Sequence, residues 1–130
     1  MKNLLVFLFL FPLTAMAAAQ NNPVLEAVAR ALGAGDADAL ARHLADNVDL
    51  SILNQEQTCS KVKATELLRS FFNTNKPRAF NQVHQGTSRG SSDQYCIGNL
   101  ATANGTFRVY VYLKISGSSA VVQELRFDRD

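Results

Sequence analysis

The stretch that decides the fold is GTFRVYVYLKISG, residues 105–117, in which apolar and polar side chains alternate. Alternation at a period of two predicts a β-strand with one buried and one exposed face. The apolar face carries Phe107, Val109, Val111 and Leu113, and the other carries Arg108, Tyr110, Tyr112 and Lys114. The first face needs a hydrophobic core, whereas the second is a candidate surface for contact with water or with a partner.

The turn before this strand predicts its neighbour on that side. Asn104-Gly105 is a strong hairpin signal, because a type I′ turn needs positive φ at both central residues. If these two residues form the loop, the preceding strand pairs in a definite register. Leu100 then lies opposite Val109, Gly98 opposite Val111, and Cys96 opposite Leu113, all on the buried face.

The turn after the strand predicts the neighbour on the other side. A three-residue loop at 117–119 sets Val111 opposite Leu125 and Val109 opposite Phe127. A two-residue loop would set Val111 opposite Glu124 and bury a charge, at a cost of several kcal/mol. We therefore expect the longer loop, which makes Gln123 face the core and leaves Val122 outside.

These registers also define the outer face of the predicted sheet. Tyr110 lies opposite Arg126 with its ring beneath the guanidinium, and Arg108 pairs with Asp128. The surface that we expect to form an interface comprises Tyr95, Ile97, Arg108, Tyr110, Tyr112, Glu124 and Arg126. The simpler interpretation is a solvated face whose cross-strand pairs each contribute at most ~1 kcal/mol. The other interpretation is an interface between proteins, because aromatic residues and arginine are enriched at the centres of such contacts.

The remaining segments predict an α+β order. Asn22-Pro23 begins a helix that ends at Gly33 or Gly35, and Asp36 caps a short helix carrying Leu40 and Leu44. A short strand with Val48, Leu50 and Ile52 follows, then a helix at 63–73. Strands are expected at 80–87, 94–102, 106–115 and 120–128. Three helices followed by an antiparallel meander differ from the alternating pattern of a parallel sheet.

The hairpin through TSRGSSD, residues 87–93, leaves two alternatives open. A loop with an even number of residues places Asn81, Val83 and Gln85 on the inner face. A loop with an odd number places Phe80, Gln82 and His84 there. The sequence therefore does not decide which face His84 occupies.

The first 17 residues have the features of a secretory signal peptide. Lys2 precedes an apolar run, and Ala15-Met16-Ala17 offers a cleavage site. The run is too short to span a bilayer, which takes about 20 residues, so we expect export to the periplasm or medium without a membrane anchor. Residues 18–130 suit one domain and carry 12 Lys and Arg against 11 Asp and Glu. This balance, without charge runs, argues against nucleic acid as a partner.

Four short segments resemble a known family. They are His84-Gln85-Gly86, Tyr95-x-Ile97-Gly98, Phe107-Arg108-Val109-Tyr110 and Gln123-Glu124-Leu125-Arg126-Phe127. With the element order, they resemble the nuclear transport factor 2-like, or cystatin-like, superfamily and, within it, the exported bacterial family named domain of unknown function 4783. The resemblance implies a strongly curved, cone-shaped antiparallel sheet around three helices, with a cavity at its open end. It also implies that the strand near Cys59 lies beside the last strand, away from Cys96.

Enzymes of that superfamily place an acid or base inside the cone, where burial shifts its pKa. The expected cavity residues here are Cys96, Leu100, Val109, Val111, Gln123 and Leu125. None of them suits general acid–base work at neutral pH, because Gln123 is an amide and Cys96 is expected in an apolar setting that raises a thiol pKa. His84 is the only weak catalytic candidate. His43, expected on the short helix, has too few neighbours for a metal site.

We therefore expect an exported, non-catalytic binding or interaction module without cofactor or metal. Its expected partners are a second copy, through the outer sheet face, and a small apolar ligand in the cone. The alternative is an isomerase or dehydratase that uses His84 inside the cone. Whether Cys59 and Cys96 form a disulfide stays open.

Overall fold

The computed structural model describes residues 22–130, so the expected signal peptide at 1–17 lies outside the described residues. Helix α1 (Pro23–Ala34) begins as predicted, because the Asn22 side chain accepts a hydrogen bond from the Val24 N–H at 2.9 Å. It ends at Gly35, whose φ of 65° is in the left-handed region that glycine adopts without strain. None of the described helices is long and apolar enough to cross a membrane.

The other two helices also begin at polar caps. Asp36 accepts from the Ala39 N–H and caps α2 (Ala37–Ala41), while Ser60 accepts from the Lys63 N–H and caps α3 (Lys61–Thr74). Leu44 is not helical as expected but begins β1, where it pairs with Val122 of the last strand.

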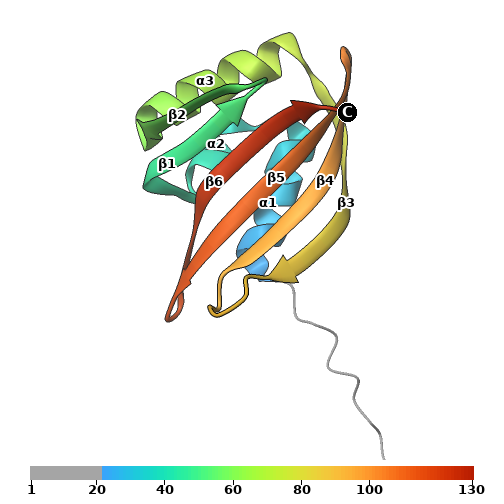
Figure 1. The fold of residues 1–130 in the computed structure, drawn as a ribbon. Coiled ribbons are helices and arrows are strands. Elements are labelled where there is room, and N and C mark those ends of the chain that lie inside the picture. The colour runs from blue at the N-terminus through green and yellow to red at the C-terminus, as the bar shows by residue number, and fades with distance from the viewer. Residues whose placement is uncertain (1–21) are drawn as a thin grey trace, which may run out of the picture.

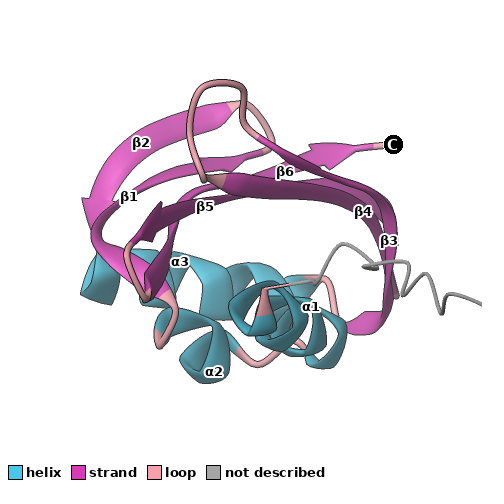
Figure 2. Cartoon of the chain, turned by 90° about the horizontal axis from the view of Figure 1, so that it is seen from below, coloured by secondary structure: helices cyan, strands magenta, loops and turns pink. Residues whose placement is uncertain are grey.

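Six strands form one curved sheet that arches over the helices (Figures 1 and 2). The strands are β1 (Leu44–Ile52), β2 (Gln55–Ser60), β3 (Pro77–Thr87), β4 (Gln94–Thr102), β5 (Gly105–Ser116) and β6 (Ser119–Arg129). Their order is β2-β1-β6-β5-β4-β3, with β1 and β6 parallel and every other pair antiparallel. The α+β fold with a strongly curved sheet is confirmed, and the sheet is mixed rather than antiparallel.

The β4–β5 hairpin differs from its predicted register by two residues. Ala103 and Asn104 form the loop, and Gly105 follows with a φ of 107°, so Leu100 pairs with Phe107 and Cys96 with Val111. The side chain of Asn104 donates to the Thr74 carbonyl at 2.6 Å, which ties this loop to the end of α3. Because side chains alternate at a period of two, a shift of two residues leaves every side chain on its predicted face.

The β5–β6 hairpin has the predicted register only away from its turn. Val111 pairs with Leu125 and Val109 with Phe127, as expected. Near the turn, however, the loop has two residues, 117 and 118, and Leu113 pairs with Val122. A bulge at Gln123 joins the two registers. The expectations for Gln123 and Val122 were therefore wrong: Val122 is fully buried and Gln123 is not.

A second bulge, at Val83, resolves the uncertainty in β3. On one side of it Phe80 pairs with Leu100 and packs against the core; on the other, Gln85 pairs with Cys96 on the same inner face. Each predicted alternative thus holds for half of the strand. The bulge places His84 opposite Ile97, which lies on the outer face.

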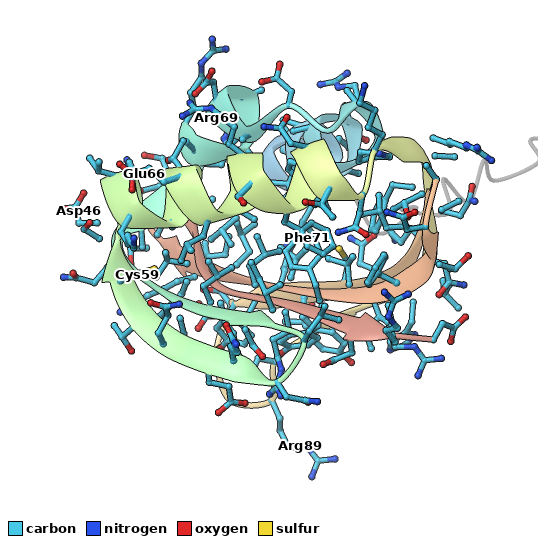
Figure 3. The ribbon with its side chains drawn as sticks, turned by 90° about the horizontal axis from the view of Figure 1, so that it is seen from above. Asp46, Cys59, Glu66, Arg69, Phe71 and Arg89 are labelled. Carbon is cyan, nitrogen blue, oxygen red and sulfur yellow. The ribbon has the colours of Figure 1, made fainter. Side chains whose placement is uncertain are left out.

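The core lies between the inner face of the sheet and the helices. Phe71 points from α3 toward the sheet (Figure 3), and its ring centroid lies 4.7 Å from that of Phe127 and 5.1 Å from that of Phe107. Phe72 lies edge-on to Phe127 at 6.2 Å. These rings fill the interior of the curved sheet with closely packed aromatic side chains.

The two cysteines are free and buried. Cys59 is on β2 and Cys96 on β4, separated in the sheet by β1, β6 and β5. Four strand spacings of ~4.8 Å separate the backbones by far more than the ~4.4–6.8 Å that a disulfide requires. The resemblance implied that the strand holding Cys59 lies beside the last strand. In the structure this strand, β2, lies beside β1 instead.

A type I′ turn joins β1 to β2, although its sequence, Leu53-Asn54, contains no glycine. Ile52 pairs with Gln55, and the two loop residues have φ values of 51° and 71°. The Leu53 N–H donates to the Phe127 carbonyl at 2.9 Å, so β6 holds the turn in place. A leucine with positive φ is unusual, because its Cβ crowds the backbone there.

We expect Leu53→Asn to stabilise the protein, since asparagine adopts positive φ at lower cost and the Leu53 side chain is 39% exposed. The free energy of unfolding should rise by about 1 kcal/mol in urea denaturation. Leu53→Val should lower it, because a β-branched residue is strained further at positive φ. If the free energy of unfolding changes in the same direction in both variants, the positive φ of residue 53 does not determine the effect.

Candidate functional site

Cross-strand pairing arranges the outer side chains of the sheet in two neighbouring rows. From β2 to β3, the first row is Thr58, Asp49, Glu124, Tyr112, Tyr95 and Gly86. The second is Glu56, Ser51, Arg126, Tyr110, Ile97 and His84. All seven residues expected at an interface lie on this outer face, with Arg108 next to the second row on β5. In both rows the carboxylates lie on β2, β1 or β6, and the tyrosines lie on β5 and β4.

The aromatic end of the rows is closely packed. The rings of Tyr95 and Tyr110 stack with centroids 6.2 Å apart and planes at 30°. Tyr95 lies across β3 because residue 86 is glycine: a Cβ there would come within 2.5 Å of the tyrosine hydroxyl oxygen. Partial burial raises the pKa of Tyr110, and the nearby Glu124 raises it further. We name Tyr95, Ile97, Tyr110 and Tyr112 the tyrosine surface.

The loop between β3 and β4 anchors one edge of this surface through Asp93. The Tyr112 hydroxyl donates to its carboxylate at 2.7 Å, and the Ile115 N–H donates at 2.9 Å. These hydrogen bonds hold the pKa of Asp93 below its ordinary value, and the one from the Ile115 N–H has the larger effect.

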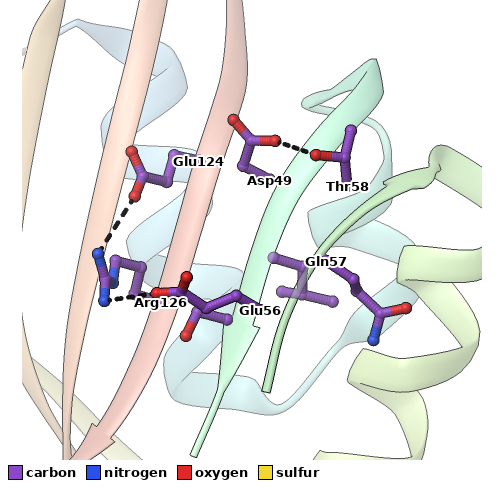
Figure 4. Close-up of a pocket in the computed structure, with 8 residues that line it drawn as sticks. Asp49, Glu56, Gln57, Thr58, Glu124 and Arg126 are labelled. Carbon is purple, nitrogen blue, oxygen red and sulfur yellow. Dashed lines mark hydrogen bonds and ion pairs between the residues drawn. The ribbon is translucent and has the colours of Figure 1, made fainter. Parts of the chain in front are cut away.

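The acidic end of the rows forms a cleft of about 390 Å³ bounded by β2, β1 and β6 (Figure 4). Arg126 lies between two carboxylates, with its guanidinium 3.1 Å from Glu56 and 3.7 Å from Glu124. Thr58 donates to Asp49 at 2.7 Å. The side chain of Arg126 thus pairs with acids, whereas the sequence predicted a position over the Tyr110 ring. Arg108 likewise pairs with Asp130, at 3.7 Å, and not with Asp128.

His84, the weak catalytic candidate, is exposed on the outer face, where its Nε2 atom lies 3.2 Å from the Tyr95 hydroxyl. The sequence left the face of His84 undecided, and this position differs from the alternative in which His84 acts inside the cone. His43 lies in the turn between α2 and β1 and not on a helix. Its pKa is lowered, mainly by burial and further by the charge of Arg42. Among residues 22–130, no group of three His, Cys, Asp or Glu side chains is placed to hold a metal ion.

Five of the six residues expected to line a cavity in the cone are at most 1% exposed and belong to the packed core: Cys96, Leu100, Val109, Val111 and Leu125. Gln123, the sixth, lies at the bulge. Burial raises the pKa of the Cys96 thiol to about 11, which suppresses the reactive thiolate. A smaller cleft of about 230 Å³ opens elsewhere, between α3 and the β1–β2 hairpin. None of the six residues lines it, and a small apolar ligand stays a prediction.

Five residues that line the acidic cleft were missed in the sequence: Asp49, Ser51, Glu56, Gln57 and Thr58. The alternation of Asp49 and Ser51 with buried Leu50 indicated that the two polar side chains share one face. Nothing in the sequence indicated that β1 lies parallel to β6 and brings Asp49 beside Glu124.

Comparisons with known proteins place this geometry in a family. Residues 25–128 match the model of a domain of unknown function, DUF4783. A solved DUF4783 structure from Bacteroides uniformis is 34% identical, with a TM-score of 0.76, covering 85% of this chain and 98% of that one. Another, from Bacteroides ovatus, is 33% identical, with a TM-score of 0.75, covering 80% and 93%. A comparison with curated protein sequences found no match.

More distant structures share the fold alone. A putative polyketide cyclase from Sinorhizobium meliloti is 8% identical, with a TM-score of 0.63, covering 83% of this chain and 95% of that one. Both the family and the cystatin-like, nuclear transport factor 2-like fold that the sequence predicted are confirmed.

Asp93 should make stability depend on pH in the acid range. Because its pKa is lowered in the folded state, its stabilising effect is complete above the unfolded pKa of about 3.9 and is lost as pH falls through the folded value. The free energy of unfolding of the wild type should therefore exceed that of Asp93→Asn by more at pH 6 than at pH 2.5, as measured by urea denaturation. If the free energies of unfolding of the two proteins differ by the same amount at both pH values, this role of Asp93 is contradicted.

Proposed function

The chain belongs to the DUF4783 family, and we propose that it is an exported, non-catalytic binding module that pairs with a second copy of itself. The contact is the tyrosine surface on the outer face of β4 and β5. The observation that carries the proposal is the half-buried cluster of three tyrosines and Ile97, held in fixed geometry on the central strands. A solvated face has no need of such a preorganised aromatic patch.

The charges around the tyrosine surface suit a copy of the same surface. Arg108 and Lys114 on β5 are exposed, while Asp128 on β6 lies directly beside Arg108. A two-fold contact presents the same patch from both sides, so a patch that carries both signs can pair opposite charges across it. A patch of one sign would repel its own copy.

Self-association is tested by sedimentation velocity of residues 18–130, from about 1 to 200 µM. We expect a dimer that Ile97→Asp dissociates, with at least a ~30-fold rise in its Kd, since a loss of ~2 kcal/mol is typical of a central contact residue. Val62→Asp is the matched control. It makes the same kind of change at a residue that is 72% exposed on α3, outside the tyrosine surface. The dimer should persist in this variant.

Circular dichroism of both variants separates loss of association from loss of folding. A wild-type chain that stays monomeric over the whole concentration range would contradict the proposal. Equal dissociation by the Ile97 and Val62 variants would contradict it as well, because the contact would then not lie on the tyrosine surface.

A further inference from the structure

We propose that the cleft bounded by β2, β1 and β6 binds a primary ammonium group carried on an alkyl chain. The proposal concerns a different part of the outer face from the tyrosine surface and does not depend on self-association. Its basis is the combination of charge, an unpaired buried hydroxyl group and available space in this cleft.

The charge of the cleft is the first observation. Three carboxylates line it, those of Asp49, Glu56 and Glu124, against one guanidinium, that of Arg126. Arg126 pairs with Glu56 and Glu124, whereas the carboxylate of Asp49 has no ion pair within residues 22–130. Asp49 and Glu124 are register partners on adjacent strands, an arrangement in which like charges repel. A cation between them would remove that repulsion.

Ser51 is the second observation and is independent of the charges. It lines the cleft, yet its residue is only 4% exposed, and its hydroxyl oxygen has no hydrogen-bond partner among the described residues. Its register neighbours are Glu56 on β2 and Arg126 on β6. A buried hydroxyl group without a hydrogen-bond partner is unfavourable. A ligand that forms a hydrogen bond with it would remove that cost.

These acceptors suit an ammonium group better than other ligands. An ammonium has three N–H donors, and Asp49, Glu124 and Ser51 supply three acceptor groups on adjacent positions of two strands. An anion would meet an excess of two negative charges. A cleft of about 390 Å³ also has room for several carbons of the attached chain.

Two sources could present this group: a free diamine or the side chain of a lysine in a partner protein. Both are tested by titrating residues 18–130 with 1,5-diaminopentane and, separately, with Nα-acetyl-lysine methylamide, using NMR of the ¹⁵N-labelled protein. We expect saturable shifts of Asp49, Ser51 and Glu124 amides with at least one probe, weakening as salt increases. The probe that binds more tightly identifies the source.

Matched variants distinguish the cleft from general attraction to acidic residues. Asp49→Asn and Ser51→Ala should each weaken binding at least tenfold, while Asp128→Asn, the same charge change on the same face outside the cleft, should leave it within twofold. Ser51→Ala should also raise Tm, since it removes an unpaired buried hydroxyl. That rise shows that the loss of binding does not come from unfolding.

The proposal is overturned if neither probe gives saturable shifts up to about 10 mM. It is also overturned if Asp128→Asn weakens binding as much as Asp49→Asn. The Ile97→Asp variant, titrated in parallel, keeps the two proposals apart: binding that persists in it supports the cleft whether or not the wild type forms a dimer.

Discussion

The packing of Phe71 against Phe107 and Phe127 is the contact on which the rest of the structure depends. In a strongly curved sheet the concave side encloses space, and here three phenylalanine rings from α3, β5 and β6 occupy it. This packing fixes α3 against the inner face of the sheet, where side chains near the middle of β4, β5 and β6, such as Leu100, Val109 and Leu125, are fully buried. Within the sheet, the side chains that remain accessible to a partner are therefore mainly those on the outer face.

Much of the central sheet was predictable because it rests on alternation, which is a local property. The predicted β4–β5 loop was wrong by two residues, yet each side chain kept its face, since faces repeat every two residues. The same arithmetic failed at Gln123 and Val83, where one extra residue reverses the alternation. The bulge at Gln123 keeps apolar side chains inside, because without it β6 could not bury both Val122 and Leu125. The bulge at Val83 has another effect: it leaves Val83 65% exposed and sets Gln85 opposite Cys96.

The acidic cleft was not predictable because it depends on contacts between distant segments. Arg126 and Glu56 are 70 residues apart, and their pairing requires β1 to lie parallel to β6. The β1–β2 hairpin gave no turn signal either, since Leu53-Asn54 lacks the glycine that usually accompanies positive φ. The tyrosine surface, in contrast, lies on strands joined by short hairpins, and local registers sufficed to place its members together.

The bulge in β3 has a consequence for how copies of this chain can meet. β3 is an edge strand, so its unpaired backbone groups offer a template on which another strand could add. Val83 interrupts that template: it is 65% exposed, and the irregularity there breaks the even spacing of N–H and C=O groups that an incoming strand must match. Pro77, at the start of the same strand, has no N–H to offer. Addition of another strand to the β3 edge is thereby disfavoured, and so is growth of the sheet into a continuous ribbon of subunits, which would need both of its edges.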